Sequence, residues 1–144
     1  MMKLIFPTMM NDCVFCKIIA KQAPAHVIYE SENIEAFLDI EPINEGHVLI
    51  VPKVHESSID RIPLDTITEI IELAQRIVTA LKETYHMDGY SMMQNGGAFC
   101  DFGHCHFHIF PRYKEDGFGW KYPVGASEYS EKVAEKLRTA LEKH

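Results

Sequence analysis

Three histidines alternate with other side chains in the stretch GHCHFHIFPR, residues 103–112. Successive side chains of a β-strand point to opposite faces of its sheet, so the alternation predicts a strand that carries all three imidazoles on one face. The three are His104, His106 and His108. The intervening side chains are expected to pack into the core on the other face: Cys105, Phe107 and Ile109. Strict alternation of three histidines favours a chemical role over three unrelated surface positions.

Such a row of imidazoles suits two different chemistries. A His-x-His pair can bind one catalytic zinc ion beside an open water position. Alternatively, one neutral imidazole can act as a nucleophile, because its ordinary pKa of about 6.5 leaves it mostly unprotonated at neutral pH. The choice between these depends on where the ligands of a metal would lie.

Cys13 and Cys16 have the Cys-x-x-Cys spacing. In a reducing cytosol such a pair is more often a metal-ligand or redox pair than a structural disulfide. Two thiolates and two imidazoles form a closed zinc site without a vacancy for water. This favours a structural zinc ion and a separate nucleophilic histidine. A redox role stays open, although no thioredoxin-like βαβ pattern surrounds the pair.

The hydrophobic patterns of the chain predict an α+β fold with a mostly antiparallel, five-stranded sheet. Strands are predicted at residues 26–31, 34–40, 46–53, 89–94 and 105–113. A short helix at 15–22 is expected to end before Pro24. A long amphipathic helix is expected at 65–86 with Asp65 as its N-cap, and a C-terminal helix with Ser127 or Ser130 as N-cap.

Length and charge restrict the class of protein. The 144 residues, 47% of them hydrophobic, suit one compact domain, and we expect a flexible extension at 1–10 and a single domain at 11–144 that includes the C-terminal helix. A net charge of −7 argues against a protein that binds nucleic acid through its backbone. No stretch reaches the roughly 20 apolar residues of a membrane span. The opening segment is too short for a secretory signal, so we expect a cytoplasmic protein.

The stretch HCHFHIF resembles the signature of the histidine triad family, in which three histidines alternate with apolar residues. The segments FCKIIAKQAPAHVIYE and AFLDIEPINEGHVLIVPKVH and the loop at Asn95 resemble the other blocks of the family in the same order. This similarity extends from about Cys13 to Arg112. With its Cys-x-x-Cys pair, the chain is similar to the zinc-containing, bacterial-type branch of histidine triad nucleotide-binding proteins.

The resemblance implies an enzyme of the nucleotide phosphoramidase or hydrolase type. His106 would be the nucleophile and would form a covalent nucleotidyl-histidine, which water or another acceptor resolves. His108 matches a position that contacts phosphate oxygens or the leaving group, and His47 matches another histidine near the phosphate. The implied reaction takes place at the α-phosphate of a purine nucleotide conjugate: a phosphoramidate, an adenylyl ester or a dinucleoside polyphosphate.

The resemblance also implies positions that bind the substrate. Asn95 matches a residue that orients the phosphate or ribose, and backbone N–H groups near Gly97 could cradle oxygens, although a plain turn is the alternative. Asp39 matches an acidic residue that hydrogen-bonds ribose hydroxyls. Four apolar residues are expected to surround the base, and core packing explains them equally well. They are Phe15, Ile18, Phe37 and Ile40.

In relatives with a Cys-x-x-Cys pair, the histidine of Pro-Lys-x-His and the first triad histidine complete a Cys2His2 site. Here the resemblance implies His55 and His104 as partners of Cys13 and Cys16. Zinc would be structural and would hold the N-terminal segment against the catalytic strand. The family commonly forms homodimers in which the sheet continues across the two-fold axis. We expect the same here, with the helix at 65–86 and the strands before it at the interface.

The segment before the triad departs from the family pattern. Many relatives have Gln-x-Val-x-His with a Ser or Thr that contacts phosphate, whereas this chain has CDFGH. Asp101 would place a negative charge near an anionic substrate unless it points away or orients a zinc-bound imidazole. Two other functions remain open: a hydrolase with catalytic zinc on the triad, and a non-catalytic nucleotide-binding module.

Overall fold

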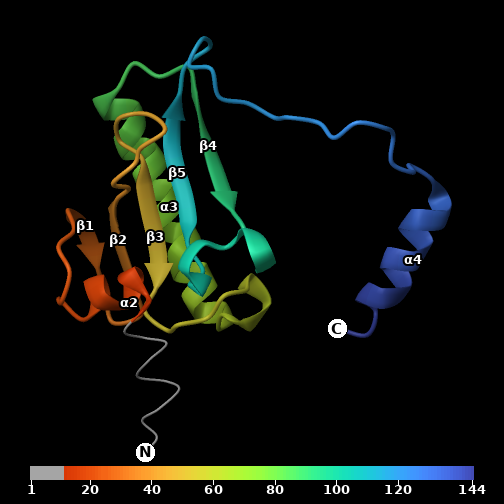
Figure 1. Cartoon of the computed structure of the whole chain (residues 1–144), viewed down its shortest axis with the longest axis horizontal. Helices are drawn as coiled ribbons and strands as arrows, with labels where there is room; N and C mark the ends of the chain where they lie inside the picture. Colours follow the sequence, from red (N-terminus) through yellow and green to blue (C-terminus); the bar gives the residue numbers. More distant parts are fainter. Residues whose placement is uncertain (1–11) are drawn as a thin grey trace, which may run out of the picture.

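The computed structural model describes residues 12–144, so the extension expected at 1–10 lies outside the described residues. A five-stranded sheet carries helices on both faces, and the C-terminal helix lies apart from it (Figure 1). The strands are β1 (Val27–Glu30), β2 (Ile34–Leu38), β3 (Val48–Pro52), β4 (Gly89–Gln94) and β5 (Phe107–Arg112). The helices are α2 (Val14–Ile19), α3 (Leu64–Thr84) and α4 (Glu131–Leu141).

The strand order is β1-β2-β3-β5-β4, and every neighbouring pair is antiparallel. The expected α+β class with an antiparallel five-stranded sheet is therefore confirmed. His108 of β5 lies opposite Leu49 of β3 and Met93 of β4. The triad segment thus enters the middle of the sheet, while β1 and β4 form the two edges.

Helix α3 covers one face of the sheet with an apolar stripe whose buried members include Ile70, Leu73 and Ile77. It begins at Leu64 with Pro63 at the N-cap position, so the prediction of Asp65 as N-cap was wrong. The carbonyl of Pro63 already accepts the N–H of Ile67 at 3.0 Å, which starts the helix earlier. Asp65 lies in the first turn, where its charge still suits the positive end of the helix dipole.

Helix α2 lies on the opposite face, where Phe15 and Ile18 pack against Phe37 of β2. The predicted helix at 15–22 was too long at its C-terminal end, because α2 ends at Ile19. Lys21 adopts a left-handed backbone with φ of 63°, which breaks the helical path before Pro24 is reached.

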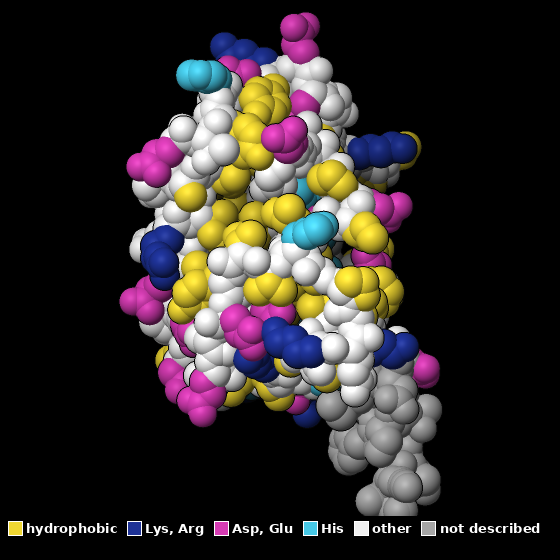
Figure 2. All heavy atoms as spheres, turned by 90° about the vertical axis from the view of Figure 1, so that its left-hand side faces the viewer, with side chains coloured by type: hydrophobic (Ala, Val, Ile, Leu, Met, Phe, Trp, Pro, Cys, Tyr) yellow, Lys and Arg dark blue, Asp and Glu magenta, His cyan; other side chains and the backbone are white. Residues whose placement is uncertain are grey.

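The side of the molecule formed by β1 faces the viewer in Figure 2 and carries basic and acidic side chains beside apolar ones. Lys21 and Lys53 both bind the carboxylate of Glu30, at 2.8 and 2.7 Å. Glu35 of β2 lies beneath this network, is fully buried, and neither of its carboxylate oxygens has a hydrogen-bond partner. Its nearest cation is Lys21, at 3.7 Å.

Strand β5 begins at Phe107, so the predicted strand at 105–113 started too early. The N–H of Cys105 donates to the carbonyl of Glu56 at 2.6 Å, which ties the triad segment to the loop after β3 instead of to a sheet neighbour. The predicted alternation of faces is nevertheless observed. The core beneath α3 contains Cys105, Phe107 and Ile109, while the three histidines lie on the other face.

Helix α4 begins after Ser130, whose hydroxyl accepts the N–H of Val133. Ser130 is therefore the N-cap, and Ser127, the other predicted N-cap, is not. None of the residues of α4 is buried. Within residues 12–144, no helix combines the length and apolarity needed to cross a bilayer.

Candidate functional site

His106 is held in one orientation by the backbone. Its Nδ1 lies 2.8 Å from the carbonyl oxygen of His104, so Nδ1 carries the proton and donates it. The proton-free Nε2 is then available as a nucleophile. The ring is buried and packs edge-on against Phe15, with the ring centroids 5.0 Å apart. The geometry therefore fixes the tautomer that nucleophilic attack requires.

His47 and His108 form a hydrogen-bonded pair whose direction follows from the backbone. The N–H of Ile43 donates to Nδ1 of His47 at 3.0 Å, so the proton of His47 resides on Nε2. Nε2 of His47 lies 2.9 Å from Nδ1 of His108 and donates to it. In a neutral His108 the remaining proton must therefore sit on Nε2. This ring can offer a hydrogen bond to a bound phosphoryl oxygen.

Burial keeps both of these imidazoles neutral. Desolvation lowers the pKa of His47, although nearby Asp39 opposes this shift. Desolvation, together with His106 and His47, lowers the pKa of His108 to about 4. The tautomers described above therefore apply at neutral pH.

Asp39 lies at the end of β2, beside these two histidines. One carboxylate oxygen accepts the N–H of Glu41 at 2.8 Å. The other lies 3.4 Å from Nε2 of His47 and 3.9 Å from Nδ1 of His108. The structure thus brings Asp39 into contact with the histidine pair, a placement that the sequence did not predict.

The residues expected to bind the substrate differ in burial and in position relative to His106. Phe15 contacts His106 directly, and Phe37 contacts Phe15 with ring centroids 5.6 Å apart. Ile18 is buried in the same cluster, whereas Ile40 is 95% exposed. Asn95 and Gly97 lie in the exposed loop between β4 and the triad, where Gly97 has a φ of 62° that favours glycine.

Phe102 was missed by the sequence analysis. Its ring packs edge-on against the ring of Phe15, with the ring centroids 5.2 Å apart. The same Phe15 ring contacts His106. Its backbone adopts φ of 63°, which is uncommon for a bulky residue and typical of strained functional loops. The sequence signal for this residue was the departure of CDFGH from the expected Gln-x-Val-x-His pattern.

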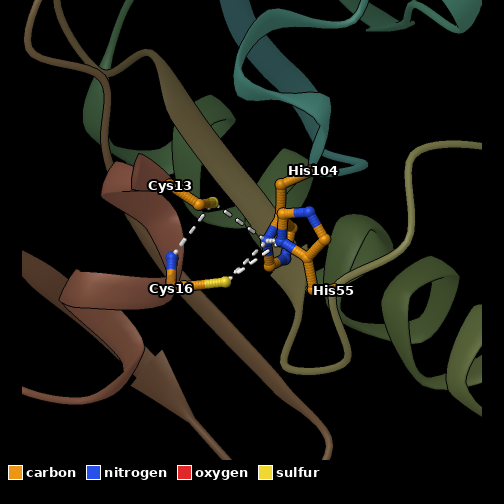
Figure 3. Close-up of side chains that lie close together, drawn as sticks. All are labelled: Cys13, Cys16, His55 and His104. Carbon is orange, nitrogen blue, oxygen red and sulfur yellow. Dashed lines mark hydrogen bonds between the residues drawn. The ribbon is translucent and has the colours of Figure 1, made fainter. Parts of the chain in front are cut away.

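The four expected metal ligands meet in one cluster (Figure 3). Cys13 and Cys16 come from the start of α2, His55 from the loop after β3, and His104 from the segment before β5. Nδ1 of His55 lies 3.1 Å from Sγ of Cys16 and 3.2 Å from Nδ1 of His104. Nδ1 of His104 lies 3.5 Å from both sulfur atoms.

The two distances of 3.5 Å match the edges of a zinc tetrahedron, and those of 3.1 and 3.2 Å are slightly shorter than such edges. Zinc bonds of about 2.3 Å to sulfur and about 2.0–2.1 Å to nitrogen separate neighbouring ligand atoms by roughly 3.3–3.8 Å. Nε2 of His104 lies 2.8 Å from the carbonyl of Pro52 and donates to it, which leaves Nδ1 free of its proton to bind metal. His106 is not a member of this cluster. The residues present therefore fit zinc, and they separate the metal ligands from the candidate nucleophile.

An antiparallel five-stranded sheet with three alternating histidines leading into one of its central strands is the arrangement expected of the histidine triad class of proteins. The chain belongs to the HIT family, because the HIT domain model matches residues 20–115.

Three relatives support this assignment. The chain is 36% identical over 141 residues to the adenosine 5'-monophosphoramidase HNT1 of Candida albicans, covering 92% of this chain and 93% of that protein. A HIT family protein from Bacillus anthracis superimposes with a TM-score of 0.81 at 31% identity, covering 92% and 96% of the two chains. A Zn-bound histidine triad family protein from Mycobacterium smegmatis gives a TM-score of 0.70 at 35% identity, covering 93% and 96%.

Proposed function

We propose that this protein is a nucleotide phosphoramidase or nucleotidyl transferase that attacks the α-phosphate of purine nucleotide conjugates with Nε2 of His106. The observation that carries the proposal is the 2.8 Å hydrogen bond from Nδ1 of His106 to the carbonyl of His104. In the neutral ring it leaves Nε2 with a free lone pair. The relative from Candida albicans is named as an adenosine 5'-monophosphoramidase, which supports this substrate class.

In the first step, Nε2 of His106 forms a bond to phosphorus while the bond from phosphorus to the leaving amine breaks. The amine departs with a proton taken up from water, and the imidazole becomes a nucleotidyl-imidazolium whose Nδ1–H still faces the carbonyl of His104. In the second step, water attacks phosphorus, the P–N bond to His106 breaks, and the attacking water loses a proton. The products are a nucleoside monophosphate and the free histidine.

The histidine pair would stabilise the charge that develops on phosphorus. Because His47 donates to Nδ1 of His108, the Nε2–H of His108 is free to donate to a phosphoryl oxygen. Asp39 would hold this pair in place with one carboxylate oxygen, and the oxygen that accepts the N–H of Glu41 would also accept a hydrogen bond from a ribose hydroxyl. Asn95 and Gly97 would contact the phosphate or ribose from the adjacent loop, and Phe15, Ile18, Phe37 and Ile40 would surround the base.

The Cys2His2 cluster would hold zinc in a structural role. Bound zinc would join α2, the loop after β3 and the triad segment into one unit. Its ligand His104 also supplies the carbonyl that orients His106. The metal site and the nucleophile would thus be coupled through a single residue.

A hydrolase with catalytic zinc on the triad is the alternative function, and one triad histidine, His108, does lie close enough to Asp39 and His47 to bind an ion with them. The hydrogen bonding of these residues argues against it. Nε2 of His47 carries a proton directed at Nδ1 of His108, so binding an ion would break this 2.9 Å contact. A non-catalytic nucleotide-binding module is the other alternative.

The variant His106→Ala, brief chelation and the turnover of the wild-type protein together distinguish the three functions. Under the proposal, turnover of adenosine 5'-phosphoramidate falls by at least about 10³-fold while zinc content stays unchanged, and the buried position of the ring predicts a lower thermal midpoint of a variant that is still folded at the assay temperature. A catalytic metal predicts instead that brief chelation abolishes activity before the protein unfolds. A binding module predicts no turnover by the wild-type protein.

We also propose a homodimer in which the sheet continues through the β4 edge. Tyr90 and Met92 of this edge are exposed, and they share the face of the sheet that α3 covers elsewhere. A second α3 beside the first would cover them. This interface differs from the expected one. Strand β4 follows α3 in the chain, whereas the strands expected at the interface precede this helix.

A further inference from the structure

The loop between β2 and β3, residues 39–47, begins with Asp39 and ends with His47, and both lie in the candidate site. Backbone hydrogen bonds close this loop. The N–H of His47 donates to the carbonyl of Asn44 at 3.2 Å, and the N–H of Asp39 donates to the carbonyl of His47 at 3.0 Å. Inside the loop, the N–H of Ile43 donates to Nδ1 of His47 at 3.0 Å. The tautomer of His47 therefore depends on the position of one loop amide.

The side chain of Asn44 ties this loop to the end of β5. Its Nδ2 donates to the carbonyl of Pro111 at 2.8 Å and to Oδ2 of Asp116 at 3.1 Å. Both partners are acceptors, so the amide nitrogen of Asn44, and not its oxygen, must point toward them. The two bonds hold Asn44 in place, and with it the adjacent residue Ile43.

Asp116 is a rigid partner for Asn44. Arg112 binds both of its carboxylate oxygens, at 2.7 and 3.2 Å. The N–H groups of Tyr113 and Phe118 donate to the same carboxylate, each at 3.0 Å. The side chain of Asp116 is only 5% exposed, and its hydrogen bond with Arg112 holds the pKa of the carboxyl well below its usual range. Asn44 therefore binds a carboxylate that is fixed in position and charged at neutral pH.

The contact of 2.9 Å between His47 and His108 allows two arrangements of protons. In the first, Nε2 of His47 donates to Nδ1 of His108, whose own proton lies on Nε2 and can be offered to a phosphoryl oxygen. In the second, His47 is protonated on Nδ1 and accepts a proton from Nδ1 of His108, whose Nε2 then presents a lone pair. That lone pair would repel the phosphoryl oxygen. The N–H of Ile43 excludes the second arrangement, because it would point at a second N–H on His47.

We propose that Asn44 is a positioning residue for the transfer reaction, which holds the Ile43 amide against His47 and so keeps the proton of His108 on the nitrogen that would meet phosphate. This inference rests on the proposed function, since it assigns a role in that same site. Asn44 acts through the loop amide and the histidine pair. Its loss should therefore lower kcat more than it raises KM, because a donor of this kind stabilises charge that develops in the transition state.

The shape-matched variant Asn44→Asp tests this role in the zinc-loaded full chain. A carboxylate has no N–H to donate and would face the carboxylate of Asp116, so both side-chain bonds of Asn44 are lost. Asn44→Ala removes the same bonds without adding a charge. Long-range nitrogen–proton correlation spectra of the imidazoles report which nitrogen of His47 carries the proton. Steady-state kinetics with adenosine 5'-phosphoramidate give kcat and KM separately.

In both variants we expect a smaller fraction of His47 with its proton on Nε2, and a kcat lower by at least about threefold with KM nearly unchanged. The control is Glu45→Gln in the same loop, which should match the wild type in both measurements. The carboxylate of Glu45 accepts a hydrogen bond from the hydroxyl of Tyr85 at 3.1 Å, and a glutamine oxygen can accept the same bond.

Two results would overturn the inference. One is a wild-type tautomer of His47 together with full kcat in the Asn44 variants. The other is a lower kcat without any change of tautomer, which would show that Asn44 only stabilises the fold. If charge repulsion unfolds Asn44→Asp, Asn44→Ala carries both measurements. Absence of turnover by the wild-type protein would refute the proposed function instead, and the spectra would still decide whether Asn44 determines the tautomer of His47.

Discussion

Nδ1 of His106 lies 2.8 Å from the carbonyl oxygen of His104, whose ring belongs to the Cys2His2 cluster. The same short segment therefore positions a metal ligand and the candidate nucleophile. Because His104 also donates to the carbonyl of Pro52, its position is fixed from both sides. Loss of the cluster should disturb the nucleophile without touching it directly.

Replacing Cys16 should remove the metal and destabilise the fold. We expect Cys16→Ser to retain less than about a tenth of the zinc of the wild type, and to lower the free energy of unfolding by more than about 3 kcal/mol. Metal analysis and denaturant unfolding measure the two effects. Cys100→Ser is the matched control, because Cys100 is not part of the cluster. Full zinc content in Cys16→Ser would refute the assigned ligand set.

Stability should fall as the pH drops from about 6.5 to about 4, partly because of His108. An unfolded imidazole takes up a proton near pH 6.5, whereas burial lowers the pKa of His108 in the folded protein to about 4. The unfolded state therefore binds more protons in this interval. His108→Asn should show a shallower loss of unfolding free energy between pH 7 and pH 5. The exposed His26 provides the control His26→Asn, and equal slopes in both variants would contradict this argument.

Replacing Glu35 should stabilise the protein at neutral pH. Its buried carboxylate has no hydrogen-bond partner, and desolvation raises its pKa. The charged form is therefore unfavourable in the folded state, and Glu35→Leu should raise the free energy of unfolding by about 1–3 kcal/mol at pH 7.

The effect of Glu35→Leu depends on pH. A raised pKa means that the folded protein regains stability as the pH falls, because protonation removes the buried charge. The advantage of Glu35→Leu should therefore shrink as the pH falls through the raised pKa of folded Glu35, and the part that comes from the buried charge should be gone by about pH 4.3, the ordinary pKa of a glutamate. Glu30→Gln serves as control, because it removes an exposed carboxylate that binds Lys21 and Lys53. Urea unfolding at pH 7 and pH 4 would decide, and a destabilised Glu35→Leu at pH 7 would contradict the account.

Much of the site was predictable from local patterns. The alternation of His104, His106 and His108 determined their common face, because a strand has a period of two. Cys-x-x-Cys spacing placed two thiolates on one turn of α2, which anticipated half of the observed ligand cluster. The five strands and both long helices followed from hydrophobic periodicity in the same way.

The features that the sequence analysis missed depend on long-range contacts. The start of β5 depends on the hydrogen bond from the N–H of Cys105 to the carbonyl of Glu56, a residue distant in the chain. The contact of Phe102 with Phe15 joins the loop before the triad to α2. The end of α2 depends on the left-handed conformation of Lys21, which the periodicity of the sequence does not predict. Contacts of this kind emerge only when separate elements pack together.

The most direct test of the central claim is the intact mass of the protein a few milliseconds after mixing with adenosine 5'-phosphoramidate. Acid quenching and peptide mapping would locate any adduct. The account predicts one adenylyl group per chain, attached to His106 and absent from His106→Ala, with the metal content unchanged. An adduct on another residue, or turnover by the wild-type protein without any adenylylated intermediate, would contradict it.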